Sequence, residues 1–87
     1  MSLTFVSTYA DCMPADQIDK AFKEIGKRIA LQRKAKGISQ DKLAYESGLD
    51  RSHVGFIEQG RRRPTVPTLI RMGKALDLPL EKLFKGF

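Results

Sequence analysis

The chain has 87 residues, a formal net charge of +6 and 41% hydrophobic residues. This length suits one domain with a single small core, and no apolar run is long enough for a transmembrane helix or a secretory signal. The single cysteine, Cys12, has no partner in the chain for a disulfide, so we interpret it as an incidental free thiol of a protein in a reducing cytosol.

The basic residues are concentrated in the later part of the chain. Residues 1–17 contain Asp11 and Asp16 but no Lys or Arg, so all 16 basic side chains lie in residues 18–87. A compact basic domain suits a polyanionic partner, although many proteins that bind no polyanion share such a charge.

The first segment, residues 1–15 (MSLTFVSTYADCMPA), shows no helical periodicity, and Pro14 ends whatever precedes it. Leu3, Phe5 and Tyr9 indicate a short extended arm. We predict that this arm is flexible, with a strand that docks on a partner subunit as the alternative. The folded domain is then expected to span residues 16–87.

A long helix is predicted from about Asp16 to Lys36, closed by Gly37. Its apolar residues recur three or four positions apart and form one stripe, Ile18, Phe22, Ile25 and Ile29. Gln32 continues this stripe where an aliphatic residue would be expected. Its amide must therefore find a hydrogen-bond partner or lie at the rim of the core.

Residues 39–60, SQDKLAYESGLDRSHVGFIEQG, predict two short helices joined by a glycine turn. Ser39 is a suitable N-cap for the first helix, Gly48 supplies the turn, and Asp50 can cap a second helix that ends at Gly60. The spacing of the apolar residues allows these helices to pack on each other and on a third, through Leu43, Ala44, Leu49, Val54 and Ile57. A helix-turn-helix of this kind offers its second helix to the major groove of DNA.

The exposed face of the second helix carries the side chains expected to meet DNA bases. Arg51 lies near the helix N-terminus, and its guanidinium matches the two acceptors of a guanine edge, with phosphate binding as the alternative. Ser52 can bond a base or a phosphate, or can serve the first helical turn. Phe56 can contact a thymine methyl, or pack against the following loop or a partner subunit. Gly55 is costly inside a helix, and either close approach to DNA or close helix packing can explain it.

His53 is the only histidine, and nothing in the chain supplies a second metal ligand or a paired nucleophile. We therefore expect no enzyme activity, no metal site and no cofactor, and place His53 beside the DNA backbone. The run Arg61, Arg62 and Arg63 follows directly on the second helix, which favours phosphate contacts over a solvated surface.

The remaining residues predict a loop and two more helices. Thr65 can cap a fourth helix that runs to Asp77, with Pro67 tolerated in its first turn. Its apolar face is expected to be Val66, Leu69, Ile70, Met72, Gly73 and Leu76. A last short helix, LEKLF, follows and is packed by Leu78, Leu80, Leu83 and Phe84. The fold class predicted is all-α, with five helices in one bundle.

Three segments resemble the phage repressor and Cro type of helix-turn-helix protein, also called the XRE family. They are EIGKRIALQRKAKGISQDKLA, SGLDRSHVGFIEQGRRRPTVPTL and ALDLPLEKLF, which together cover roughly residues 24–84. The stretch LDRSHVGFIEQGRRRPT also resembles the controller proteins of restriction–modification systems. The resemblance implies a compact lambda-repressor-like domain. Departures from the family pattern are Gln32, Asp77 and Pro79, none of which lies on the expected DNA-reading surface.

The resemblance also implies roles for single residues. Arg33 and Glu58 match an ion pair of the family that ties the first helix to the reading helix. Gln40 would contact a phosphate and brace the reading helix. Base contacts are expected from Arg51, Ser52 and Phe56. Gln59, Arg61, Arg62 and Arg63 would touch the DNA backbone or the minor groove, as Gln40 would touch a phosphate. Apart from the resemblance, Ser39 and His53 are also expected to contact the DNA backbone.

The function expected is a sequence-specific regulator of transcription that binds double-stranded DNA. We expect a prokaryotic or phage protein that acts in the cytoplasm, associated with the nucleoid. A lone module of this size makes few base contacts, so we expect a homodimer on a (pseudo)palindromic operator with half-sites ~34 Å apart. The dimer interface is predicted at the C-terminal end and consists of Leu80, Leu83, Phe84 and Phe87. The alternative is that these side chains close the core of the monomer itself. The alternative function is an antitoxin-type module that neutralises a protein partner through the N-terminal arm.

Overall fold

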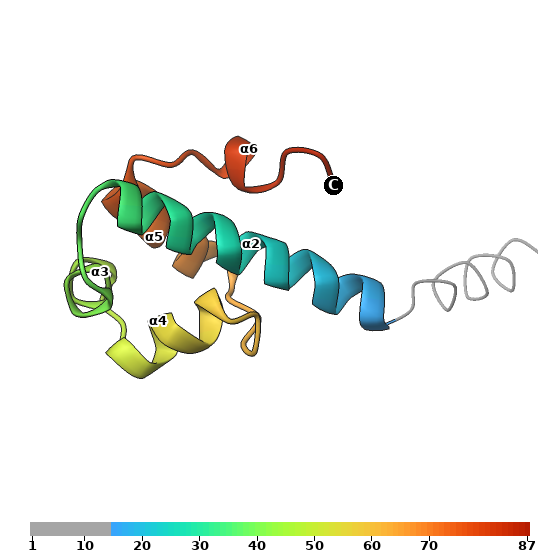
Figure 1. The fold of residues 1–87 in the computed structure, drawn as a ribbon, viewed down its shortest axis with the longest axis horizontal. Coiled ribbons are helices and arrows are strands. Elements are labelled where there is room, and N and C mark those ends of the chain that lie inside the picture. The colour runs from blue at the N-terminus through green and yellow to red at the C-terminus, as the bar shows by residue number, and fades with distance from the viewer. Residues whose placement is uncertain (1–14) are drawn as a thin grey trace, which may run out of the picture.

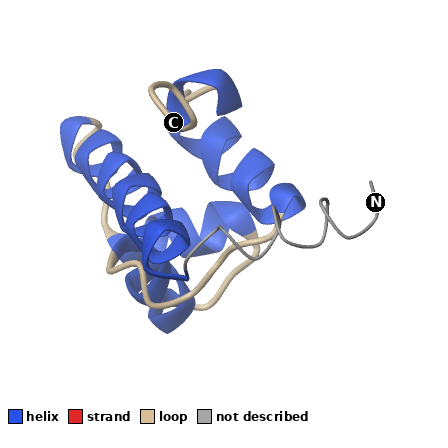
Figure 2. Cartoon of the chain, turned by 90° about the vertical axis from the view of Figure 1, so that its right-hand side faces the viewer, coloured by secondary structure: helices blue, strands red, loops and turns tan. Residues whose placement is uncertain are grey.

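The computed structural model describes residues 15–87, and this part of the chain folds into five helices without a strand (Figures 1 and 2). The helices are α2 (Ala15–Ala35), α3 (Gln40–Ser47), α4 (Arg51–Glu58), α5 (Val66–Leu76) and α6 (Leu80–Leu83). The all-α, five-helix prediction is therefore confirmed. The predicted N-terminal arm lies outside the described residues, apart from Ala15, which begins α2.

The long helix α2 is the element on which the other helices are assembled. It contacts α4, α5 and α6, while α3 packs against α4 and α5. In Figure 1, α2 runs across the molecule with α4 on one side and α6 on the other. One core joins all five helices, and its buried apolar side chains are Ile25, Ile29, Leu43, Ala44, Val54, Ile57, Leu69, Met72, Leu76 and Leu83.

The helix ends mostly follow the local signals of the sequence. The Oγ of Ser39 accepts a hydrogen bond from the Lys42 backbone N–H at 3.0 Å, and Gly48 ends α3 in the left-handed conformation with φ of 69°. Asp50 occupies the N-cap position of α4, but its side chain makes no capping hydrogen bond. Asp77 ends α5 with φ of 54°, a conformation that Asp tolerates better than most residues.

The unusual Gln32 on the apolar stripe has the partner that its amide needs. Its Nε2 donates to the backbone carbonyl of Leu76 at 3.0 Å. Leu76 is the last residue of α5, so this oxygen is one of the carbonyls that a helix end leaves without an intrahelical donor. Gln32 therefore joins α2 to the C-terminus of α5.

The apolar face of α5 is narrower than predicted. Val66 and Ile70 are 58% and 39% exposed and do not belong to the core. Part of the apolar surface of α5 therefore faces solvent.

Candidate nucleic-acid interface

The helices α3 and α4 form the predicted helix-turn-helix, with the turn closed by a hydrogen bond from the Leu49 N–H to the Ala44 carbonyl at 2.8 Å. Val54 and Ile57 hold one face of α4 in the core. The opposite face of α4 is therefore presented to solvent.

This exposed face contains a shallow recess of about 220 Å³. Six residues from α3, α4 and the end of α4 line it, namely Gln40, Arg51, Ser52, Gly55, Phe56 and Gln59. The structure thus brings together all three residues predicted to contact bases and two of those predicted to contact the DNA backbone. His53 and Ser39 lie outside this recess, His53 half-buried and Ser39 exposed.

Arg51 is held only loosely in the free protein. Its Nε lies 3.6 Å from Oδ1 of Asp41, and the two side chains are 67% and 75% exposed. Such exposed ion pairs contribute at most about 1 kcal/mol. The Asp41 carboxylate therefore leaves the guanidinium free to turn toward another partner.

Behind the recess, Glu58 connects three helices. Its carboxylate accepts hydrogen bonds from Nε and a terminal nitrogen of Arg33, at 2.7 and 3.2 Å, and from Nε2 of Gln40 at 2.9 Å. Arg33 and Glu58 are 11% and 7% exposed at their side chains. Because these contacts join α2, α3 and α4, they fix the orientation of α4 and the position of the Gln40 amide at the recess.

The three arginines after α4 do not all make the same contacts. Arg61 and Arg62 place their guanidinium carbons 5.6 and 5.8 Å from the centroid of the Phe56 ring, within the range of a cation–π contact. Phe56 therefore packs against the following loop, which was one of the alternatives for this residue. The stacking keeps two cationic groups beside the recess.

Arg63 is directed elsewhere. A terminal nitrogen donates to Oδ1 of Asp19 at 2.6 Å, and the guanidinium lies 5.7 Å from the ring centroid of Phe22. The loop after Gly60 thus turns the third arginine onto α2. We therefore expect Arg63 to contribute less to DNA binding than Arg61 and Arg62.

Gly26 positions α4, a role that no pattern in the sequence indicated. A Cβ at this position would lie 2.7 Å from the carbonyl oxygen of Glu58 and closer still to that of Ile57. The backbone of α2 therefore lies directly against the C-terminal end of α4. Only residues distant in sequence create this requirement, which explains why the glycine was missed.

The C-terminal residues predicted to form a dimer interface differ in their surroundings. Leu83 is fully buried within the monomer, so its predicted contact with a partner is wrong, because α6 uses it to close the core. Leu80 is half-buried, while Phe84 and Phe87 are 41% and 60% exposed. Arg28 fastens this end to α2 by donating to the carbonyls of Lys82 and Leu83.

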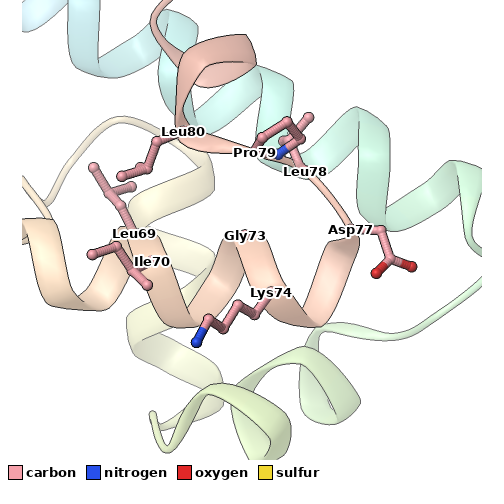
Figure 3. A pocket seen from close by; sticks show the side chains of 8 residues that line it. All are labelled: Leu69, Ile70, Gly73, Lys74, Asp77, Leu78, Pro79 and Leu80. Carbon is pink, nitrogen blue, oxygen red and sulfur yellow. The ribbon is translucent and has the colours of Figure 1, made fainter.

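An open groove of about 480 Å³ lies between α5 and the segment leading into α6. Figure 3 shows Leu69, Ile70 and Gly73 of α5 along one side, and Leu78, Pro79 and Leu80 of the following segment along the other. Lys74 and Asp77 add polar groups at the edge.

No group of three or more His, Cys, Asp or Glu side chains in residues 15–87 is placed to hold a metal ion. No helix in this range combines the length and apolar character needed to cross a membrane.

A glycine turn between two short helices, with an arginine-bearing second helix presented to solvent, defines a helix-turn-helix DNA-binding protein. The chain belongs to the helix-turn-helix family HTH_3, whose model matches residues 29–83. The resemblance to this class is thereby confirmed, and the protein is a transcriptional regulator of the helix-turn-helix type.

Several relatives are restriction–modification control proteins. Control protein C.SmaI of Serratia marcescens is 39% identical over 62 residues, which cover 70% of this chain and 74% of that protein. The controller protein C.AhdI of Aeromonas hydrophila has 41% identity and a TM-score of 0.70, covering 72% of this chain and 96% of its own. The C.Esp1396I tetramer in complex with its natural 35 base-pair operator has 31% identity and a TM-score of 0.67. The match covers 75% of this chain and 86% of the C.Esp1396I chain. The antitoxin alternative has no support among these relatives.

Proposed function

We propose that the protein regulates transcription as a homodimer that inserts α4 of each subunit into the major groove of a (pseudo)palindromic operator. The observation that carries this proposal is the recess on α4, where Arg51, Ser52 and Phe56 converge with polar groups from α3. The related C.Esp1396I binds its operator as a tetramer, which supports assembly of several copies on DNA. Such a regulator would act in the cytoplasm of a bacterium, where its DNA lies.

Each group of the surface has a distinct chemical use. Arg51 can place its guanidinium fork on the O6 and N7 atoms of a guanine, and Ser52 can donate to a neighbouring acceptor. Arg61 and Arg62, stacked beside Phe56, offer positive charge to phosphates. Base contacts then select the sequence, while phosphate contacts hold α4 in register.

The dimer would be formed at the opposite end of the domain. Ile70, Phe84 and Phe87 are exposed, and Ile70 and Leu80 line the groove beside α5. Burial of this surface between two copies removes apolar area from water and sets two reading helices about one helical turn of DNA apart.

The test is selection of binding sites from a random duplex pool, followed by anisotropy titration of the selected sequence and of a scrambled version. A palindromic consensus with half-sites about 10 base pairs apart supports the dimeric regulator. Enrichment of no sequence, with weak binding that disappears as salt rises, would contradict it.

Arg51→Ala should weaken binding to the selected operator by about 1–3 kcal/mol, the size expected for one bidentate base contact. The preference should relax at one base position in each half-site, while binding to scrambled DNA changes little. Repeating the selection with the variant measures both effects. Arg71→Ala, which removes an exposed charge from α5, is the matched control and should keep the full consensus. A variant with an unchanged consensus would show that Arg51 reads no base.

The three arginines after α4 should differ in their contribution to phosphate binding. Arg61→Gln and Arg62→Gln should each reduce the slope of log K against log salt by about 0.9, the value expected for one lost phosphate contact. Arg63→Gln should leave the slope unchanged, because Asp19 already engages that guanidinium. Titrations across a salt series give the three slopes. An equal loss in all three variants would argue that DNA releases Arg63 from α2.

A further inference from the structure

Gly55 occupies the centre of the exposed face of α4. Arg51 lies four residues before it and Gln59 four residues after it, so the three positions share one side of the helix. Gly55 also lines the recess, together with Ser52 and Phe56. At this position the predicted reading surface is therefore backbone without a side chain.

The folded chain itself does not require a glycine at this position. A Cβ added to Gly55 would meet only the side-chain amide of Gln40, at 3.9 Å, which is an ordinary van der Waals separation. Gly55 is also absent from the residues with positive φ. Close helix packing, one of the two explanations considered from the sequence, is thereby removed.

Every other glycine of the chain has a local reason in the fold. Gly26 and Gly73 lie against backbone carbonyl oxygens that a Cβ would approach too closely. The other four have positive φ, a region that side chains disfavour. Glycine is less favourable than alanine inside a helix. Gly55 is therefore the one glycine that destabilises its helix although the fold of the free protein does not require it.

We propose that Gly55 is a specificity-determining residue, whose missing side chain lets the major-groove edge of a base pair enter the recess. This inference rests on the proposed function. With the edge seated against the backbone of α4, Arg51 and Ser52 reach base atoms, and the Phe56 ring forms an apolar wall. A Cβ would hold the helix away from the bases, whereas phosphate contacts by Arg61 and Arg62 lie beyond the recess and survive.

The test uses Gly55→Ala in the full chain, with the selected operator and scrambled DNA as probes. The variant should unfold at a higher temperature than the parent, since alanine favours the helix. Its operator affinity should fall at least about fivefold, the lower end of the loss for one base contact, while its affinity for scrambled DNA stays unchanged. Gly55→Leu should lose more operator affinity than Gly55→Ala.

Gln17→Ala is the matched control, because Gln17 lies exposed on α2, away from the recess; it should leave both affinities unchanged. A Gly55→Ala variant that binds the operator as tightly as the parent would overturn the inference, and so would one that unfolds at a lower temperature. If the parent itself selects no operator, the proposed function fails first and the inference fails with it. If the parent protein selects an operator, an unexpected result with Gly55→Ala contradicts only the inference about Gly55 and not the proposed function.

Discussion

Replacing Glu58 by alanine should destabilise the domain by about 3–5 kcal/mol, the range measured when one partner of a buried ion pair is removed. The Arg33 side chain is only 11% exposed, so the variant leaves a desolvated guanidinium without its carboxylate. Gln40 also loses the acceptor for its Nε2. Since small domains have 5–15 kcal/mol of total stability, much of the folded state would be lost. Urea unfolding of both proteins measures the difference.

Two further variants separate this explanation from a general effect of lost charge. Asp19→Asn breaks an ion pair whose side chains are 52% and 56% exposed and should cost less than about 1 kcal/mol. Combining Glu58→Leu with Arg33→Met removes both charges and should recover a large part of the lost stability. If Glu58→Ala were no more harmful than Asp19→Asn, the ion pair would not be what holds α4 against α2.

Gly26→Ala should destabilise the domain by about 2–3 kcal/mol, within the range for an overpacked core. The added methyl group would lie 2.7 Å from the Glu58 carbonyl oxygen and closer to that of Ile57. These atoms are helix backbone, which cannot rotate away as a side chain can, so α2 and α4 must separate. The loss should exceed the gain that alanine normally brings to a helix.

The matched comparison for Gly26→Ala is Gly55→Ala, the same chemical change in another helix. The first variant should unfold at a lower temperature than the parent and the second at a higher one, as thermal unfolding followed by circular dichroism will report. Because Gly26 also sets the position of α4, its substitution should weaken binding to operator and scrambled DNA together. A Gly26 variant as stable as the parent would refute the close-contact explanation.

Most of the fold follows from local sequence patterns. The stripe of Ile25 and Ile29, the Ser39 cap and the Gly48 turn each depend on residues within about four positions, so periodicity and capping rules recover them. The same rules place Arg51 on the open face of α4. The pattern overestimated the apolar face of α5, because it cannot tell which apolar residues a neighbouring helix covers.

The sequence by itself determined the five helices and the helix-turn-helix, and it predicted that Arg51 on the second helix of this motif reads DNA. Only the tertiary structure decided that Leu83 is a core residue, that Arg63 turns back to Asp19, and that Gly26 is required by packing while Gly55 is not. The physical reason is that each of these outcomes depends on atoms brought together from distant parts of the chain. Helix periodicity and capping act within a few residues, whereas burial, ion pairing and close backbone contact exist only after the helices have packed.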